Sequence, residues 1–502
     1  MNRKTDVRRA APIEIEPDEF RRLGHQLVDT IAEFMGTLSE RAVMPSQTPN
    51  QIRSALGIQN PLPEHGTDAG ALLDEAARLL FDYSTFNGHP RFLAYITSSA
   101  APLGALGDLL AASVNPNVGG GPLAPMATEI EAQTIRWIAE LLGYPTDCGG
   151  LLVSGGNMAN FTAFLAARRA KAPWDVRTTG MNGPHLCVYT SAETHTWIQK
   201  AADLFGLGTD SIRWLPTDAD LRMDLSALRQ AIADDRAHGR VPMMVVGTAG
   251  STPTGAIDPL PEIAAICREN DLWFHVDGAY GAPAVILPDA PADLKGLSLA
   301  DSVAIDPHKW LYTPLEAGCV LVRDAKALVD AFSYHPVYYH LDGTGSDLNH
   351  INYYEYGPQN SRGFRALKVW LTLRQVGRAG YAQMIADDIQ LAEALYRLAD
   401  THPELEAVTL GLSVTTFRFV PADLTPGSEK VESYLNDLNN ALLTRLGAGG
   451  EVSLSNAVVA GKYLLRSCVV NFRTSLADMQ ALPEIITREG RALDAEIRPD
   501  DL

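Results

Sequence analysis

The chain contains a lysine in a position where it could act as a nucleophile. Lys309 lies in DSVAIDPHKWLYTP (residues 301–314), directly after an apolar run typical of a buried strand. Burial beside Pro307 and Trp310 would remove water from the amine, which favours its neutral, nucleophilic form. A surface lysine in a strand-to-loop turn would give the same local sequence, so the other reactive groups of the chain decide between the two interpretations.

Other polar groups also follow predicted strands. The turn SGGN (residues 154–157) follows GLLV, and His195, Thr248 and Asp277 follow three further apolar runs. Ligands of open α/β sheets bind beyond the carboxyl ends of the strands, so we expect these groups at one edge of a sheet. Each group also has an ordinary alternative: a simple strand–helix turn, a core histidine, the end of a strand, or an aspartate that caps a helix.

Taken together with Lys309, these groups match a single ligand, an aromatic cation that carries an aldehyde and a phosphate. Lys309 would form a Schiff base with the aldehyde, Asp277 would keep a ring nitrogen protonated, and His195 would stack on the ring. Thr248 and the glycine-rich turn would hold the remaining polar groups and the phosphate. This ligand is pyridoxal 5'-phosphate. The turn lacks the GxxxxGK[ST] and GxGxxG motifs, so it supports neither an ATP loop nor a dinucleotide site.

The elements that must position these groups alternate between strand and helix. From residue 96 to 370, runs such as HLCVYT, VPMMVV and DLWFHV alternate with helical stretches. This pattern predicts an α/β domain with a mainly parallel central sheet and helices on both faces. Within it, Thr128 and Glu131 of TEIE predict a capping box at the start of a helix.

Two smaller regions flank this domain. Residues 1–95 are predicted to form a helical arm with no sheet of its own, and residues 371–502 a small C-terminal α+β domain. We expect the arm to bury its apolar stripe against a partner subunit, because no strand of its own covers it. The stripe consists of Phe20, Leu23, Leu27, Ile31, Phe34 and Leu38.

Composition excludes several classes of protein. The net charge is 41 − 60 = −19, which argues against nucleic acid as a partner. The five cysteines form no CxxC pair, so neither a disulfide framework nor a zinc site is expected, and we expect no metal. The first 20 residues lack the apolar core of a signal peptide, and no segment is apolar enough to span a bilayer. We therefore expect a cytoplasmic protein with no membrane partner.

Motifs along most of the chain resemble those of one family. EFRRLGHQLVDTIAEFM, HPRFLAYITSSAAP, TEIE, VSGGNMAN, HVDGAYG, DPHKWL and SRGFRALKVW occur in the order found in group II pyridoxal-phosphate-dependent amino-acid decarboxylases. The chain is most similar to the aromatic-L-amino-acid decarboxylases among them. The resemblance implies the transferase fold type I, conversion of an L-amino acid to its amine and carbon dioxide, and a homodimer with shared active sites.

The resemblance also implies roles for individual residues. Lys309 corresponds to the lysine that carries the cofactor, Asp277 to the partner of the ring nitrogen, and His195 to the histidine that stacks on the ring. Asp306 departs from the asparagine often found in the family, and its carboxylate would repel a phosphate. The positions that correspond to the phosphate cup are Gly155, Gly156, Asn157 and His308.

A tyrosine supplies the proton in the family, from a mobile loop. The segment FSYHPVYYHLDGTGSDLNHINYY corresponds to this loop, and Tyr338 matches the tyrosine by register, with Tyr339 beside it. A phenylalanine at that position is associated in the family with aldehyde-forming chemistry, so a retained tyrosine favours simple decarboxylation.

Substrate identity depends on fewer residues. Tyr95, Ser98 and Ser361 match positions associated with the substrate pocket of aromatic-specific relatives, whereas Asn87 and the glycines of NVGGGPLAP replace bulky aromatics. An aromatic amino acid is the predicted substrate.

Other activities remain open at this stage. They are decarboxylation of a non-aromatic amino acid of the glutamate or diaminobutyrate type, aldehyde synthesis, and transamination on the same fold. A cofactor-dependent regulator would need a basic DNA-binding module, which the sequence lacks. The tyrosine loop and the N-terminal arm favour a decarboxylase.

Overall fold

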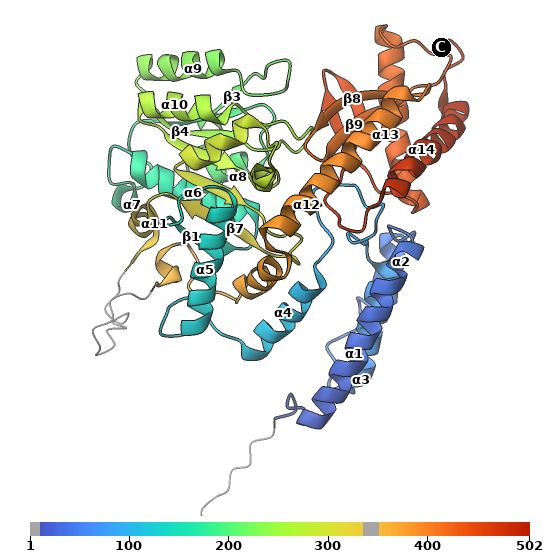
Figure 1. The fold of residues 1–502 in the computed structure, drawn as a ribbon, viewed down its shortest axis with the longest axis horizontal. Helices are drawn as coiled ribbons and strands as arrows, with labels where there is room; N and C mark the ends of the chain where they lie inside the picture. The colour runs from blue at the N-terminus through green and yellow to red at the C-terminus, as the bar shows by residue number, and fades with distance from the viewer. Residues whose placement is uncertain (1–10, 335–350) are drawn as a thin grey trace, which may run out of the picture.

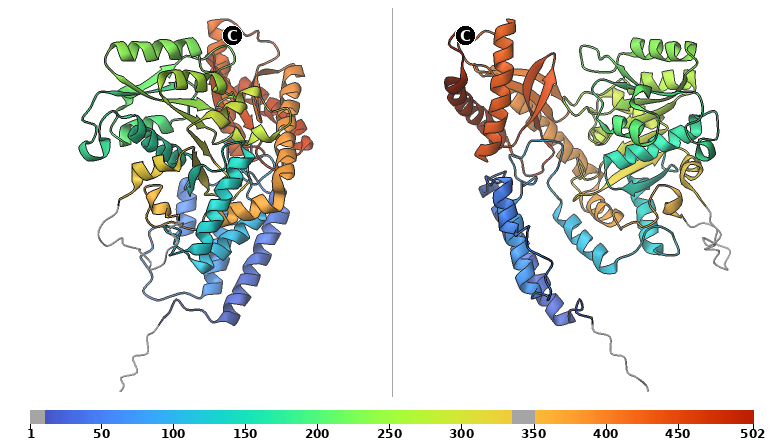
Figure 2. Two further views of the ribbon diagram at one scale, coloured as in Figure 1. Left: turned by 60° about the vertical axis from the view of Figure 1, so that its left-hand side comes forward. Right: turned by 180° about the vertical axis from the view of Figure 1, so that it is seen from behind.

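The computed structural model describes residues 11–334 and 351–502 of the chain (Figure 1). A large α/β body carries the central sheet, a smaller antiparallel sheet lies near the C-terminus, and a helical N-terminal segment extends away from both (Figures 1 and 2). The predicted fold class is confirmed by this architecture. The three residue ranges predicted for the domains stay predictions.

The central sheet contains seven strands in the order β1-β7-β6-β5-β4-β2-β3. Only β7 runs antiparallel to its neighbours β1 and β6, so the other strands end at the same edge. The strands are β1 (Gly149–Val153), β2 (Leu186–Ser191), β3 (Ile212–Leu215), β4 (Val241–Thr248), β5 (Trp273–Asp277), β6 (Ser302–Ile305) and β7 (Gly318–Val322).

Helices cover both faces of this sheet, as the sequence pattern predicts. The connections that contain α6 and α8 cross the sheet in one direction, and those that contain α9 and α10 return in the other. Right-handed crossovers therefore place the two pairs on opposite faces. The helices of this body are α4 (Pro102–Val114), α5 (Pro125–Leu141), α6 (Gly156–Lys171), α7 (Val176–Thr179), α8 (Trp197–Leu204), α9 (Leu225–Ala237), α10 (Leu260–Asn270) and α11 (Ala325–Phe332).

The predicted capping box at Thr128 is wrong. The helix α5 begins three residues earlier, at Pro125, because proline needs no hydrogen-bond acceptor in the first turn. Glu131 therefore lies inside the helix and serves another purpose. Its fully buried carboxylate accepts a hydrogen bond from the backbone N–H of Leu152 in β1 and pairs with the buried guanidinium of Arg362, with 2.5 Å between Oε1 and Nη2.

This buried ion pair leads to a prediction about stability. Arg362→Met should lower the free energy of unfolding by about 3–5 kcal/mol, because the carboxylate of Glu131 would remain buried without its cation. Urea unfolding followed by circular dichroism measures the change. Arg397→Met is the matched control, since Arg397 pairs with Glu393 on an exposed surface and should cost less than about 1 kcal/mol. Equal losses in the two variants would contradict the prediction.

The C-terminal part is built on a four-stranded antiparallel sheet in the order β10-β11-β9-β8. The long helix that leads into it has a break at Gly377, where φ is 66°. The elements are α12 (Ala366–Thr401), β8 (Leu405–Gly411), β9 (Val414–Phe419), α13 (Glu429–Gly449), β10 (Ser455–Val459), β11 (Lys462–Cys468) and α14 (Leu476–Ile497).

The N-terminal segment forms a pair of long helices that project from the body (Figures 1 and 2). Stacked rings of Phe34 and Phe81, with centroids 4.3 Å apart, join α1 to α3. Within the predicted apolar stripe, Leu23 and Leu38 are buried, whereas Phe20 is exposed. The elements are α1 (Pro17–Thr37), α2 (Pro49–Leu56) and α3 (Ala69–Tyr83).

Candidate active site

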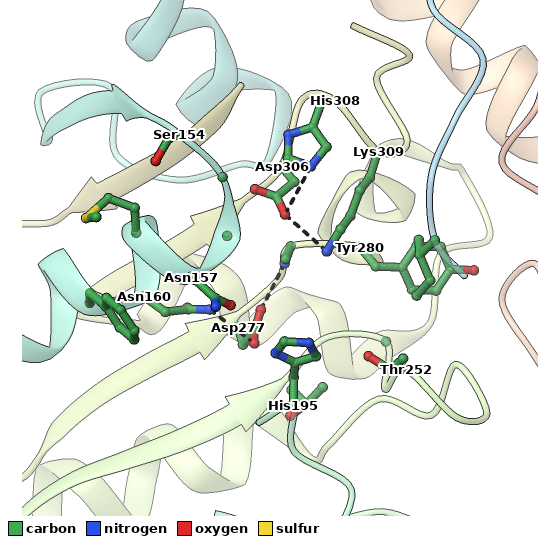
Figure 3. Close-up of a pocket in the computed structure, with 18 of the residues that line it drawn as sticks. Ser154, Asn157, Asn160, His195, Thr252, Asp277, Tyr280, Asp306, His308 and Lys309 are labelled. Carbon is green, nitrogen blue, oxygen red and sulfur yellow. Dashed lines mark hydrogen bonds and ion pairs between the residues drawn. The ribbon is translucent and has the colours of Figure 1, made fainter. Parts of the chain in front are cut away.

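A cavity of about 460 Å³ opens at the carboxyl ends of the parallel strands (Figure 3). Seven of the residues predicted for cofactor binding line it, and Lys309 projects into it from the turn after β6. The structure thus brings together residues that are up to 154 positions apart in the sequence. These predicted residues are Gly155, Gly156, Asn157, His195, Thr248, Asp277 and His308.

The Lys309 amine has a carboxylate as its partner. Its Nζ lies 3.0 Å from Oδ2 of Asp306, and the side chain is 23% exposed. The sequence predicted mainly apolar surroundings for this lysine. The ion pair with Asp306 is therefore an addition to that prediction, and it aims the amine into the cavity (Figure 3).

Asp277, at the end of β5, is held by three donors. Its Oδ2 accepts hydrogen bonds from Trp197 Nε1 at 2.8 Å and Asn160 Nδ2 at 3.3 Å, and its Oδ1 accepts one from the backbone N–H of Ala279 at 3.2 Å. A carboxylate offers about four acceptor positions. One position therefore remains for a donor in the cavity.

A buried chain of hydrogen bonds lies behind Asp277. The ring of His275 lies 2.7 Å from Asn160 Oδ1 through Nε2 and 2.8 Å from Ser302 Oγ through Nδ1. Complete burial lowers the pKa of His275 to about 4, so its ring is neutral at pH 7. Because Asn160 presents its oxygen to His275, its NH₂ group is turned towards Asp277.

His195 lies on the loop between β2 and α8, across the cavity from Lys309 (Figure 3). Its Nδ1 accepts a hydrogen bond from the backbone N–H of Trp197 at 3.3 Å, so Nε2 carries the proton in the neutral ring. Desolvation by the surrounding protein lowers the pKa of His195, and the charge of Asp277 opposes this change. A neutral, flat ring at this place is suited to stacking.

The N-terminus of α6 provides a cradle for an anion. Gly155 has a φ of 132°, which side chains rarely allow, and this conformation starts the helix directly after β1. A Cβ atom on Gly156 would lie 2.7 Å from Asp306 Oδ2, so only glycine fits there. The backbone N–H groups of the first turn are free to bind a phosphate.

His308 closes the same end of the cavity. Its Nδ1 lies 2.7 Å from the carbonyl oxygen of Ala317, and its Nε2 lies 3.7 Å from Asp306 Oδ2. Burial lowers the pKa of His308, although Asp306 acts in the opposite direction. We therefore treat His308 as a neutral hydrogen-bonding group next to the cradle.

These residues fit pyridoxal phosphate. Two buried side-chain oxygens in the cavity, Thr248 Oγ1 and Asp306 Oδ1, have no hydrogen-bond partner within the protein. The cavity also offers an amine for the aldehyde, a carboxylate for the ring nitrogen, and a helix N-terminus for the phosphate. Buried polar atoms without partners are costly, so they favour a polar ligand.

Four predicted site residues are not brought into this cavity. Tyr95 and Ser361 are exposed on the described chain, and Ser98 lines a neighbouring cavity of about 330 Å³, where its hydroxyl donates to the carbonyl oxygen of His308. Tyr338 lies outside the described residues. Their roles stay predictions.

Sequence reasoning missed the two side chains that donate to Asp277. Asn160 follows Asn157 by three residues in NMAN, which places both on one face of α6. Trp197 follows His195 by two residues, and its indole N–H needs a partner when buried. Those spacings could have indicated both donors.

Comparison with known proteins decides the family. Residues 49–419 match the model of the pyridoxal-dependent decarboxylase conserved domain. The chain belongs to this family. An aromatic-L-amino-acid decarboxylase from Bacillus atrophaeus is 35% identical over 468 residues, which are 93% of this chain and 94% of the relative.

Other relatives cover nearly the whole chain. The solved structure of Catharanthus roseus tryptophan decarboxylase in complex with L-tryptophan has a TM-score of 0.85 and 26% identity, over 96% of this chain and 100% of that one. A phenylacetaldehyde synthase from a Rosa hybrid cultivar is 30% identical, over 91% of this chain and 90% of the relative. The prediction of an amino-acid decarboxylase that uses pyridoxal phosphate is confirmed.

Residues 11–334 and 351–502 contain no group of histidine, cysteine, aspartate and glutamate side chains arranged to hold a metal ion. In the same residues, each helix is too short or too polar to cross a membrane.

Proposed function

We propose that this pyridoxal-dependent decarboxylase converts an aromatic L-amino acid into the corresponding amine and carbon dioxide. The observation that carries the proposal is that Lys309 and Asp277 face one cavity beside the α6 cradle. The relatives described as aromatic-L-amino-acid, tyrosine and tryptophan decarboxylases support the aromatic class.

Each part of the cavity has a place in holding the cofactor. We assign the covalent link to the Lys309 amine and the ring nitrogen to the free acceptor position of Asp277. The α6 cradle and His308 would hold the phosphate, His195 would stack on the ring, and the unpartnered Thr248 hydroxyl would hydrogen-bond a polar group of the bound molecule.

Bound pyridoxal phosphate supplies an electrophilic aldehyde and a ring that accepts the electron pair left when carbon dioxide departs. The residues of the chain control this chemistry through charge. Asp277 holds a proton at the ring nitrogen, since a carboxylate in hydrogen-bond contact favours the charged form of its partner. The donors Trp197 and Asn160 fix the carboxylate in place, so it does not have to reorient during the reaction.

A panel assay tests the proposed reaction. Purified protein loaded with cofactor is incubated with aromatic, acidic and basic L-amino acids, and the amine and the carbon dioxide that are released are both measured. We expect an aromatic substrate to release amine and carbon dioxide in equal amounts. Release of carbon dioxide from glutamate or diaminobutyrate alone would refute the aromatic class, and a keto acid without carbon dioxide would indicate an aminotransferase.

Aldehyde synthesis is the second candidate, because phenylacetaldehyde synthases occur among the relatives. Tyr338 separates the two reactions, since we assign it as the donor of the proton to the carbon that loses its carboxylate. Tyr338→Phe should retain cofactor binding and make about a hundredfold less amine, the scale of a lost general acid. Part of the turnover should instead consume dioxygen and water and yield aldehyde, carbon dioxide, ammonia and hydrogen peroxide, which coupled assays measure.

Tyr339→Phe is the matched control for this variant. It should reduce amine formation less than Tyr338→Phe, because Tyr338 is the match by register. Amine formation at the parent rate in Tyr338→Phe, with no aldehyde, would assign the proton to another group, with His195 as the next candidate.

We further propose a cytoplasmic homodimer in which the N-terminal helices pack on the partner subunit. Large apolar side chains of α1, α3 and α4 are exposed on the single chain, among them Phe20, Leu80 and Leu109. Exposed apolar surface on this scale indicates an interface. A partner could also cover Tyr95 and Ser361, which would bring them to a shared active site.

Light scattering tests the dimer. The wild-type chain should have twice the mass of one chain, and Leu80→Asp should shift the population towards monomer by burying a charge in the interface. Glu75→Ala on the same helix is the control and should remain dimeric. An active wild-type monomer would refute the shared interface.

A further inference from the structure

Asp306 places a carboxylate next to the α6 cradle, where the cofactor phosphate would also bring negative charge. It is 2% exposed, its Oδ2 pairs with Lys309, and its Oδ1 has no partner. The same carboxylate closes the space in front of Gly156 at the start of α6, so a phosphate bound there would be its neighbour. Two fully ionised oxyanions in this place would repel each other strongly.

Among the described side chains that line the cavity, none except Lys309 provides a cation to compensate this charge. The titratable groups that interact with Asp306 are Lys309 and His308 on its own segment, His195 on the loop after β2, and Cys319 on β7. Burial lowers the pKa of both histidines and raises that of Cys319, so all three favour their neutral forms. Among the described residues that line the cavity, Lys309 is the one side chain with an ammonium or guanidinium group.

The covalent link to the cofactor engages this single ammonium group. The amine would condense with the aldehyde and release water, so Asp306 would lose its free ammonium partner while the phosphate would occupy the cradle. A proton is the remaining way to reduce the charge, and it would also give the unpartnered Oδ1 a hydrogen bond. Two acidic groups in contact commonly share one proton for this reason.

We propose that Asp306 and the cofactor phosphate share one proton, so that binding of pyridoxal phosphate takes up a proton that binding of pyridoxal does not. The inference rests on the proposed role of the α6 cradle as the phosphate site. A phosphate monoester loses its second proton with a pKa of about 6. Above that pH, the required proton must come from solvent, and cofactor affinity falls as the pH rises.

Calorimetry on the wild-type chain is the first test. The cofactor-free protein is titrated at pH 8 with pyridoxal phosphate and with pyridoxal, in two buffers of different ionisation enthalpy. Both ligands form the same covalent link, so their difference in proton uptake reports on the phosphate. We expect a difference of about one proton per site. A difference near zero overturns the inference.

Asp306→Asn provides the second test, because it removes the charge and keeps the size of the side chain. The ratio of wild-type to variant Kd for pyridoxal phosphate should rise about tenfold per pH unit between pH 7 and 8.5. The same ratio for pyridoxal should stay constant. If the Kd values of the wild type and the variant for pyridoxal phosphate change with pH in parallel, the inference is overturned. If the variant does not fold, the wild-type calorimetry decides between the two outcomes.

These experiments measure cofactor binding and not turnover, so they distinguish a failure of the shared-proton inference from a failure of the proposed reaction. Cofactor binding without the extra proton refutes the shared proton and leaves the proposed reaction intact. Uptake of the extra proton by a protein that makes no amine refutes the proposed reaction alone.

Discussion

Replacing Lys309 with alanine is expected to abolish the covalent link between protein and cofactor. Borohydride reduction should fix pyridoxal phosphate to the wild-type chain, as seen by mass spectrometry, and should leave the variant unlabelled. Amine formation should fall by about 10⁴-fold or more, the scale found when a covalent nucleophile is removed. The reason is that Lys309 is the amine that projects into the cavity between Asp306 and His195 (Figure 3).

Two control variants isolate the covalent role. Lys309→Arg keeps a cation beside the buried Asp306 but cannot form the link, so it should fold at least as well as the alanine variant and remain unlabelled. Lys368→Ala removes another lysine with little exposure, whose Nζ lies 3.1 Å from Asp108 and outside the cavity, and it should label fully. Labelling of Lys309→Ala would assign the cofactor to a different lysine.

The sequence was sufficient for the main layout of the fold because its strands are buried on both faces. Continuous apolar runs such as LWFHV mark β5, and their alternation with helices implies a parallel sheet. It did not reveal β3, whose Arg213 and Trp214 are partly exposed, or β7, which lies between β1 and β6. Insertion of an antiparallel strand depends on distant neighbours, and local periodicity carries no information about them.

The candidate site likewise contains residues that the sequence could predict and residues that it could not. Residues that end strands, such as Lys309 and Asp277, were predictable because the edge of a parallel sheet collects them. Partners that reach them from elsewhere were not, as Trp197 shows: its bond to Asp277 spans 80 residues. The sequence indicated that Asp306 departs from the family pattern, but the lysine it pairs with and its unpartnered oxygen became visible only in three dimensions.

Asp277→Asn is the second change for which we expect a large effect. An amide at this position can still accept hydrogen bonds, but it has no negative charge to keep the ring nitrogen protonated. We expect kcat to fall by about 10³-fold, the upper range for loss of one preorganised electrostatic contact. Cofactor labelling by borohydride should remain, because Lys309 and the α6 cradle are unchanged. Steady-state kinetics on the loaded variant give the measurement.

The loop between β4 and α10 offers a matched control for this substitution. Asp258 is another buried aspartate, which accepts hydrogen bonds from the backbone N–H groups of Met223 and Thr248, and burial raises its pKa to about 6. It does not line the cavity, so Asp258→Asn should alter stability and leave kcat of the folded enzyme within about threefold of the wild-type value.

Trp197→Phe removes one donor to Asp277 and should have an intermediate effect on kcat, because it loosens the carboxylate without removing its charge. If Asp277→Asn turns over at nearly the wild-type rate while Trp197→Phe does not, the charge of Asp277 is not what drives the reaction, and its role is limited to shaping the cavity.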